Sequence, residues 1–343
     1  MSARQVTLAE VAKQAGVSLA TASRVLNGST RQVSEELSDR VLRTAEQLGY
    51  VPNASAQALA RNSSSLVGLV VHDITDPYFS CIAAGVTRVA EEAGLVVVLG
   101  TTGRRPEREV ELLSTLRAHR ARAVVLAGSR TTDRASQARL AAEIDAFTEQ
   151  GGRVACVSQA KLGTDTVVPG NRAGGRALAR ALAELGHRRF AVLGGPAELV
   201  VARDRLAGFK AGLADAGIAP PVVVNGAFTR DGGYEAALEL LASKSRATCV
   251  FAVTDVMAMG AMAALRERGV RVPEDMSIAG FDDIPTLRDT VPALSTVRLP
   301  LEEMGEIAAG LVLDAGGDEA RTVRVAGEVV LRASTGHNIL ATT

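Results

Sequence analysis

The sequence predicts an α/β protein with an N-terminal all-α headpiece and a two-lobed core built on parallel sheets. Within residues 7–48 the apolar residues recur only at helical spacing. From residue 66 onward, near-continuous apolar runs of strand length alternate with helical stretches, which is typical of parallel strands covered by helices on both faces. A chain of 343 residues is long enough for two or three domains.

Residues 7–28 predict two short helices joined by a turn. The apolar face of the first helix consists of Leu8, Val11, Ala12 and Ala15. Thr7 and Glu10 have the spacing of a capping box, and Gly16 ends the helix. Ser18 then caps the second helix. Two helices joined in this way are typical of a helix-turn-helix.

The second helix has one apolar side and one side with small and hydrogen-bonding residues. The inward side carries Ala22, Val25 and Leu26, and the outward side carries Ala20, Ser23, Arg24 and Asn27. Such an outward face suits the major groove of DNA, where hydroxyls bind phosphates, arginine binds guanine or phosphate, and Leu19 or Ala20 contacts thymine methyls. A plain helical hairpin with solvated polar residues is the alternative interpretation.

The segment after the second helix predicts a third helix and then a short, isolated one. Ser34 is the expected cap of the third helix, Leu37, Val41, Ala45 and Leu48 form its apolar side, and Gly49 ends it. Residues 53–61 favour helix but are too few to hold one alone in water, so this segment is suited to fold on binding. An ordinary linker helix is the alternative. We therefore expect a headpiece at 1–52, a hinge helix and linker at 53–65, and a core at 66–343.

The core is predicted to contain two lobes with a crevice at the carboxyl ends of their strands. The expected strands are 66–72, 95–101, 123–128, 153–158, 189–195, 248–253 and 276–281, and the expected helices between them are 81–93, 107–118, 173–186, 203–216, 232–242 and 256–268. Ligands bind at strand carboxyl ends in this architecture. Several strand ends carry aromatic rings, carboxylates and a guanidinium, a mixture that suits a sugar or a nucleobase.

The headpiece resembles the LacI/GalR family of bacterial transcription regulators. The matching segments are residues 7–8, 11–12, 15–18 and 21–27, with Ala22 where the family usually has valine. The predicted hinge matches through Tyr50, Pro52, Asn53, Ala56, Leu59 and Ala60. The helix pattern and the resemblance together imply DNA contacts from Thr7, Ser18, Leu19, Ala20, Thr21, Ser23, Arg24, Asn27, Tyr50, Asn53, Ala56 and Leu59. In the family the leucine matching Leu59 is a minor-groove wedge.

The resemblance continues through the core to about residue 335. The matching segments are residues 76–79, 203–209, 257–261, 280–283 and 331–335. They imply the periplasmic-binding-protein type I fold, with effector contacts from Tyr78, Phe79, Arg205, Phe228, Thr254 and Asp282. Leu199 and Val201 replace residues that are often polar or basic in the family, and Thr254 replaces a frequent asparagine, so one side of the crevice should be less polar.

Each expected effector residue also has a purely structural interpretation. Asp282 could cap a turn, Arg205 could form a salt bridge in its helix, and Phe228, Tyr78 and Phe79 could pack in the core. Asp73 and Asp76 are better read as caps than as ligand groups.

The resemblance implies a homodimeric repressor that binds a near-palindromic operator and responds to a small molecule. We expect a sugar that acts as an inducer, and a nucleobase corepressor is the alternative. The residues after Leu331 contain no leucine heptads, which favours a dimer over a tetramer.

Composition argues against other classes of protein. The net charge is +0, whereas residues 1–62 carry seven basic and five acidic residues. The three cysteines and four histidines lack metal-ligand spacing, so we expect buried free thiols, no metal and no cofactor. We find no catalytic motif, which argues against an enzyme. The absence of a signal segment argues against a secreted solute-binding protein and predicts a cytoplasmic location. A DNA-bending architectural protein fits poorly, because most of the chain is a predicted ligand-binding module.

Overall fold

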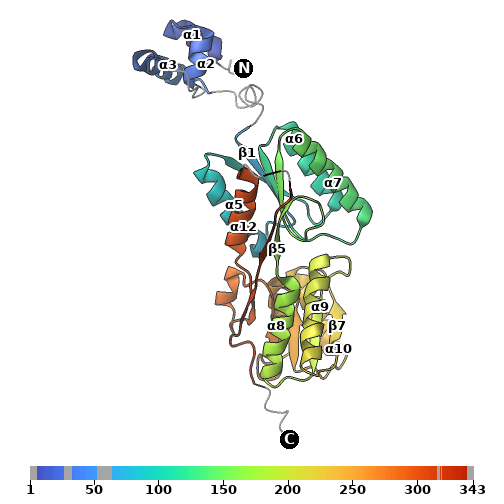
Figure 1. Ribbon diagram of the computed structural model, residues 1–343. Helices are drawn as coiled ribbons and strands as arrows, with labels where there is room; N and C mark the ends of the chain where they lie inside the picture. Colours follow the sequence, from blue (N-terminus) through green and yellow to red (C-terminus); the bar gives the residue numbers. More distant parts are fainter. Residues whose placement is uncertain (1–5, 27–32, 52–63, 315–316, 318, 338–343) are drawn as a thin grey trace. The chain divides into compact units, whose positions relative to one another are not determined.

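A computed structural model describes residues 6–26, 33–51, 64–314, 317 and 319–337 (Figure 1). The chain divides into two compact units, residues 1–65 and residues 66–343. Of the residues predicted to contact DNA, Asn27, Asn53, Ala56 and Leu59 lie outside the described residues. No helix among the described segments is long and apolar enough to cross a membrane.

The first unit contains α1 (Leu8–Ala15), α2 (Leu19–Leu26) and α3 (Glu35–Leu48). The predicted capping box is present at the start of α1, and Gly16 ends this helix in the left-handed conformation. Gly49 ends α3 in the same way. The prediction that Ser34 caps α3 is wrong in one respect. Ser34 occupies the cap position, but its side chain makes no capping hydrogen bond.

The three helices enclose a small aliphatic core. Its buried members are Val11, Ala12, Ala15, Ala22, Val41 and Ala45. Val25, Leu26 and Tyr50 pack against this group while remaining partly exposed. The inward side predicted for the second helix is therefore confirmed, and the opposite side of α2 faces away from this core.

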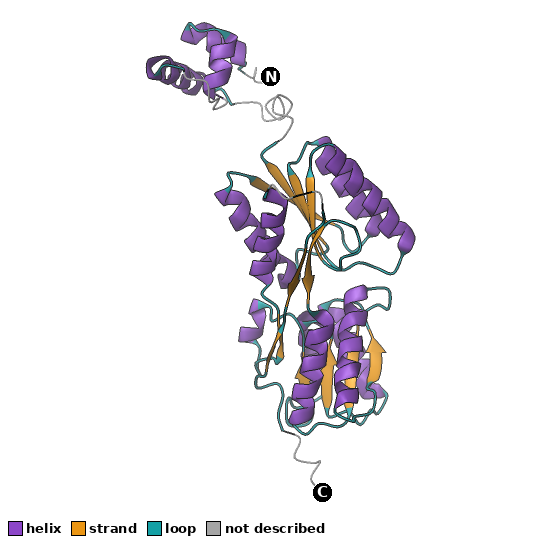
Figure 2. Ribbon diagram, viewed as in Figure 1, coloured by secondary structure: helices purple, strands orange, loops and turns teal. Residues whose placement is uncertain are grey.

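The N-terminal lobe of the second unit is a parallel sheet between two pairs of helices (Figures 1 and 2). Its elements are β1 (Leu66–Val71), α5 (Pro77–Glu92), β2 (Val96–Thr101), α6 (Pro106–Ala118), β3 (Ala123–Ala127), α7 (Arg134–Glu149), β4 (Arg153–Val157), β5 (Asp165–Pro169), α12 (Leu301–Leu313) and β11 (Thr322–Val325). The strand order is β11-β5-β4-β3-β1-β2, and all neighbours are parallel. Helices α5 and α12 cover one face, and α6 and α7 cover the other.

The C-terminal lobe repeats this layering. Its elements are α8 (Asn171–Glu184), β6 (Phe190–Gly194), α9 (Val200–Asp215), β7 (Val222–Asn225), α10 (Arg230–Ala242), β8 (Cys249–Ala252), α11 (Asp255–Glu267), β9 (Ser277–Ala279), the 3-10 helix η1 (Pro285–Asp289), β10 (Thr296–Arg298) and β12 (Glu328–Val330). The parallel strands follow the order β7-β6-β8-β9. Strands β10 and β12 form a separate antiparallel pair.

The chain passes between the lobes more than once, and the last passages were not predicted. After the C-terminal lobe, α12 returns to pack against α5 of the N-terminal lobe. Glycines allow this close packing, because a Cβ on Gly85 would lie 2.0 Å from the carbonyl oxygen of Glu302. Helix α7 and strands β5, β7, β10, β11 and β12 are also absent from the elements expected from the sequence. Cys156 and Cys249 are buried as expected, whereas Cys81 is only half-buried.

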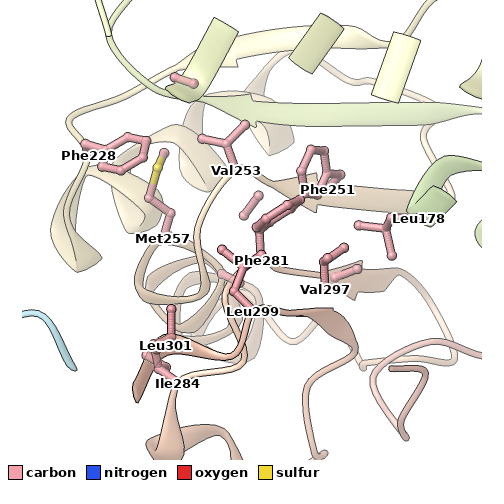
Figure 3. Close-up of a cluster of buried hydrophobic side chains, with 14 of the residues drawn as sticks. Leu178, Phe228, Phe251, Val253, Met257, Phe281, Ile284, Val297, Leu299 and Leu301 are labelled. Atoms are coloured by element: carbon pink, nitrogen blue, oxygen red, sulfur yellow. The ribbon is translucent and has the colours of Figure 1, made fainter. Parts of the chain in front are cut away.

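An aromatic and aliphatic core supports the C-terminal lobe beneath the crevice (Figure 3). Phe209 and Phe251 stack with ring centroids 4.7 Å apart. Phe228, Met257 and Phe281 belong to the same buried cluster. Phe228 and Asp282, the neighbour of Phe281, line the crevice, so this rigid core positions part of its wall.

Candidate functional site

A cavity of about 40 Å³ lies between the two lobes at the carboxyl ends of their strands. It brings together all the residues predicted to contact an effector, namely Tyr78, Phe79, Arg205, Phe228, Thr254 and Asp282. Tyr78 and Phe79 belong to the N-terminal lobe, and the others belong to the C-terminal lobe. The cavity is smaller than a sugar ring, so side chains or lobes must move to admit one.

Arg205 and Asp282 form a buried ion pair in the wall of the cavity. The Arg205 Nη2 donates to Asp282 Oδ1 at 2.6 Å, and Nη1 donates to Asp282 Oδ2 at 3.1 Å. The same guanidinium donates to Asn171 Oδ1 and to the carbonyl oxygen of Val253, and it stacks 4.0 Å from the centroid of the Phe281 ring. Arg205 and Asp282 are 2% and 4% exposed. A bidentate pair of this kind has a defined geometry, and its oxygens and N–H groups match a sugar diol.

Asp282 is held in an unusual backbone conformation beside a second buried carboxyl group. Its φ is +122°, in the left-handed region, and backbone hydrogen bonds to Val297 and Leu299 fix it on both sides. Burial raises the pKa of Asp282 to about 6, although Arg205 opposes the shift. Burial likewise raises the pKa of Asp255 to about 8, with a contribution from the Asp282 charge.

Asp255 ties α11 to the loop that carries Asp282. Its carboxyl oxygens accept hydrogen bonds from the Thr296 hydroxyl at 2.7 Å and from the Ile284 backbone N–H at 3.1 Å. The neighbouring Thr254 caps α11, because its hydroxyl accepts the N–H of Met257 at 3.3 Å. Thr254 therefore combines a structural role with a position on the cavity wall.

The N-terminal lobe contributes aromatic rings and one acidic cap. Asp76 accepts the backbone N–H of Tyr78 and so caps α5, and Asp73 accepts hydrogen bonds from Thr75 in a turn. The predicted capping roles are thus confirmed, although Asp76 also lines the cavity. Tyr78 and Phe79 meet edge to face with centroids 5.0 Å apart. Burial raises the pKa of the Tyr78 phenol, so this group stays protonated and can donate a hydrogen bond.

Arg104 enters the cavity wall from the loop between β2 and α6. Its Nη2 donates to the carbonyl oxygen of Phe228 at 3.3 Å, and its guanidinium lies 5.1 Å from the centroid of the Phe228 ring. The same nitrogen is 4.0 Å from Asp76 Oδ2. Burial lowers the pKa of Arg104, which Asp76 partly counteracts. Arg104 therefore links the N-terminal lobe to the C-terminal lobe across the cavity.

Main-chain hydrogen bonds also join the lobes beside the cavity. Thr131 and Leu199 form an antiparallel bridge. The N–H of Val200 donates to the carbonyl oxygen of Arg130, and the N–H of Val201 donates to the Ser129 hydroxyl, both at 3.0 Å. The apolar residues noted at 199 and 201 thus make contacts through their backbones. These hydrogen bonds hold the two lobes together on one side of the cavity.

Several cavity residues were missed by the sequence analysis. Arg104, Ser129, Gln159 and Asn171 all line the cavity. The strand-end rule that identified Asp282 could have found Ser129 after β3 and Gln159 after β4. Asn171, in contrast, opens α8 after a passage between lobes, and no local pattern marks this position.

The outward face of α2 is exposed, as the helix-turn-helix pattern predicts. Ser18, Leu19, Ala20 and Arg24 are exposed, and Thr21 and Ser23 are partly exposed. Leu19 stands out because an apolar side chain is 54% exposed there. A single exposed leucine is common on protein surfaces, and here it suits contact with a thymine methyl group.

Some predicted DNA contacts also serve as helix caps. Thr7 caps α1 through the capping box with Glu10. The Ser18 hydroxyl accepts the N–H of Thr21 at 3.1 Å and bonds to the Thr21 hydroxyl at 2.8 Å. Tyr50 is partly buried against the helical core. The contacts between Ser18 and Thr21 fix the start of α2, where a recognition helix comes closest to DNA bases.

Comparisons with known proteins cover both units. Residues 7–53 match a model described as bacterial regulatory proteins, lacI family, and residues 179–335 match a periplasmic binding protein-like domain. The chain is 36% identical over 319 residues to the HTH-type transcriptional regulator GalS of Salmonella typhimurium, covering 90% of this chain and 89% of the relative.

Solved structures agree over nearly the full length of the chain. One is the lac repressor dimer bound to operator and the anti-inducer ONPF, with a TM-score of 0.83, 27% identity, and coverage of 97% of this chain and 100% of that chain. Another is a complex of the transcriptional regulator CelR with cellobiose, with a TM-score of 0.71, 31% identity, and coverage of 96% and 100%.

Proposed function

The chain belongs to the lacI family of bacterial regulatory proteins, and from this premise we propose a cytoplasmic, homodimeric repressor that a small molecule releases from a near-palindromic operator. Regulation of transcription through sequence-specific DNA binding is the activity of this family. Beyond this activity, we propose that the effector releases the protein from its operator and that the effector is a sugar.

The convergence of the predicted effector residues on one cavity carries this proposal. Arg205 and Asp282 offer donors and acceptors with fixed geometry, and Phe228 and Tyr78 offer aromatic faces beside them. Sugars present vicinal hydroxyls on one edge and C–H groups on their faces, so this wall is complementary to them. The CelR structure with cellobiose shows a related regulator in complex with a sugar.

Coupling to DNA follows from the position of the cavity between the lobes. A ligand that contacts Tyr78 from one lobe and Arg205 from the other favours one spacing of the lobes over another. Strand β1 of the N-terminal lobe begins at Leu66, directly after the predicted hinge and linker at 53–65. A change in lobe spacing in each of two copies would alter hinge spacing and release the paired headpieces.

Exposed apolar residues support self-association. Strand β2 forms one edge of its sheet, and Val96 and Val98 on it are 58% and 41% exposed. In the C-terminal lobe, Val291 is 93% exposed. An exposed apolar edge strand is a liability unless another chain covers it, and we assign this role to a second copy. The variants Val96→Glu and Val98→Glu should shift the protein to monomer in light scattering and weaken operator binding.

The test of this function starts with selection of binding sequences from a pool of random duplexes. The purified protein should enrich a near-palindromic site, because a twofold protein needs a twofold site. Fluorescence anisotropy with this operator should then show release by a sugar. Failure to enrich any sequence would contradict sequence-specific DNA binding. Enrichment without release by any small molecule would contradict only the claim that an effector controls this binding.

A variant of the headpiece and a matched control test whether operator binding can be weakened without a change in effector binding. Arg24→Ala should weaken operator binding by roughly 10- to 100-fold while effector affinity stays unchanged, because loss of one base-contacting arginine costs about 1–3 kcal/mol. Arg40→Ala removes the same charge from an exposed position on α3 and serves as the control.

A purine that tightened operator binding would favour the alternative function, a repressor that a nucleobase corepressor activates.

A further inference from the structure

Arg104 has hydrogen-bond donors that no other described residue accepts. An arginine has five N–H donors. In Arg104 the Nη2 group donates to the Phe228 carbonyl oxygen, and the nearest carboxylate, Asp76, is 4.0 Å away. No acceptor among the described residues lies within hydrogen-bond distance of its Nε or Nη1. Arg205, in contrast, reaches Asp282, Asn171 and Val253 with three nitrogens.

The backbone of Arg104 is strained in a way that directs its side chain. Its φ is +61°, which is unfavourable for a residue with a Cβ, and Gly103 before it has a φ of +59°. The Arg104 N–H donates to the Thr102 hydroxyl, which also bonds to His72. Strain that is held by surrounding contacts and that places a charge in a cavity motivates a functional hypothesis.

A second donor lies on the same wall. The Gln159 Oε1 accepts hydrogen bonds from the Arg130 backbone N–H at 2.9 Å and from the Ser158 hydroxyl at 3.2 Å. These two hydrogen bonds fix the orientation of the Gln159 amide. Its Nε2 group points away from both donors and has no acceptor among the described residues. Gln159 and Arg104 both line the cavity and both belong to the N-terminal lobe.

We infer that the effector is an anionic sugar, a sugar phosphate or a sugar acid, whose negative group binds Arg104 and Gln159 while its hydroxyls bind Arg205 and Asp282. This inference rests on the proposed function and names the ligand class of the same site. The N-terminal lobe supplies donors without acceptors, and the C-terminal lobe supplies a donor and acceptor pair. A neutral sugar offers the Arg104 donors only hydroxyl oxygens, whereas an anionic group offers them a negative charge and hydrogen bonds that are roughly twice as strong.

Asp76 does not prevent an anion from binding beside it. One of its oxygens already accepts the Tyr78 N–H, and burial raises its pKa, which lowers the cost of protonating it. A second, smaller cavity of about 30 Å³ adjoins the site and shares Arg104 and Ser129 in its lining. Movement of the Arg104 side chain toward a ligand would open the space between the two cavities.

The test compares neutral sugars with their charged derivatives on the full-length protein. D-glucose, D-glucose 6-phosphate and D-glucuronate form one set, and the galactose, ribose and fructose sets follow the same plan, with thermal shift first and calorimetry on each hit. We expect a charged member to bind at least roughly tenfold more tightly than its neutral parent, since one charged hydrogen bond is worth about 10- to 100-fold. The phosphate and acid arms distinguish the two sources of charge.

Two variants of the same loop locate the charge recognition. Arg104→Gln should weaken binding of the charged sugar roughly 10- to 100-fold, and Arg104→Lys should fall between wild type and Arg104→Gln. Arg105→Gln is the matched control, because Arg105 is adjacent and exposed. An unchanged melting temperature of each variant without sugar shows that it is folded.

Three results would overturn the inference. Tight binding of a neutral sugar with no gain from its charged derivatives would contradict the ligand class but leave the proposed repressor standing. Full affinity of Arg104→Gln for a charged sugar would contradict the role of Arg104. A lack of binding by every sugar, charged or neutral, would contradict both this inference and the sugar response, while the operator-selection experiment would still decide whether the protein is a regulator.

Discussion

The two walls of the crevice use charge in opposite ways. On the C-terminal lobe, Arg205 and Asp282 are almost fully buried and form two hydrogen bonds with each other. On the N-terminal lobe, Arg104 is only loosely paired with Asp76. Removal of one partner from a buried ion pair leaves the other charge buried and uncompensated, which strongly destabilises the fold. Removal of a loosely paired arginine should cost little, and its unpaired donors can bind a ligand. We therefore expect variants of Arg205 to lose both stability and effector binding, and variants of Arg104 to lose mainly effector binding.

Arg205→Ala should produce the largest loss of stability. It leaves the Asp282 carboxylate buried without its cation, which costs about 3–5 kcal/mol, whereas Arg104→Ala should cost about 1 kcal/mol or less. Urea unfolding of both variants measures the difference. Effector binding should be lost in Arg205→Ala even at temperatures where the variant remains folded.

A double variant checks the cause of that loss. Arg205→Met combined with Asp282→Asn removes the stranded negative charge, with a residue that tolerates the positive φ of this position, and should recover part of the stability without restoring effector binding. Equal stability losses in Arg205→Ala and Arg104→Ala would refute the contrast between the walls.

Gly195→Ala should have the next largest effect, through the apolar part of the C-terminal wall. A Cβ at this position would lie 2.5 Å from Cδ2 of Phe228, so the ring must shift toward the cavity or the backbone must move. Overpacking of this kind costs about 1–3 kcal/mol, and effector affinity should fall as well. Gly310→Ala is the control, because a Cβ there meets nothing within 4 Å and should be neutral or stabilising. Unaltered effector affinity in Gly195→Ala would show that Phe228 does not contact the ligand.

The pH dependence of stability should reveal the buried carboxyl group behind the C-terminal wall. The folded chain holds the Asp255 proton up to a pKa of about 8, against an ordinary value of 3.8. The folded state therefore binds more protons between these values, so the free energy of unfolding falls as pH rises, by at most about 1.4 kcal/mol per pH unit for this group. Asp255→Asn should flatten the slope between pH 5 and 8, as followed by urea unfolding at each pH. A slope identical to wild type would mean that Asp255 is ionised throughout this range.

Arg104→Gly should give the smallest effect. Glycine accepts the φ of +61° that strains arginine and alanine, so Arg104→Gly should be about 1 kcal/mol more stable than Arg104→Ala. The comparison uses thermal unfolding without ligand, and Arg105→Gly against Arg105→Ala is its control, because Arg105 is not among the positive-φ residues. The reverse order would mean that Arg104 carries no backbone strain.

Local patterns in the sequence predicted the headpiece well, because its helices are marked by caps and periodicity. The Thr7 and Glu10 capping box, the left-handed Gly16 and the buried Ala22 all appear as expected. The hinge at 53–61 lies outside the described residues, so its helix and the wedge role of Leu59 stay predictions.

The crevice was only partly predictable, because much of it depends on contacts between distant segments. Position at a strand end indicated Asp282, but not that Arg205, separated from it by 77 residues, would pair with it. Helix α12 was missed because it follows the C-terminal lobe in the chain yet packs against α5 and the sheet of the N-terminal lobe, and no local pattern marks a contact between such distant segments. Arg104 follows a strand end, yet only the structure shows that its turn directs it across the cavity toward Phe228.

The most direct test of the whole account is the affinity of the effector for the protein with and without operator DNA. Calorimetry with a charged sugar found by the thermal-shift screen should give a dissociation constant roughly 5- to 150-fold higher for the operator-bound protein, because coupling between sites is typically about 1–3 kcal/mol and is reciprocal. Equal dissociation constants in the two states would mean that occupation of the crevice does not control DNA binding, and would contradict the account.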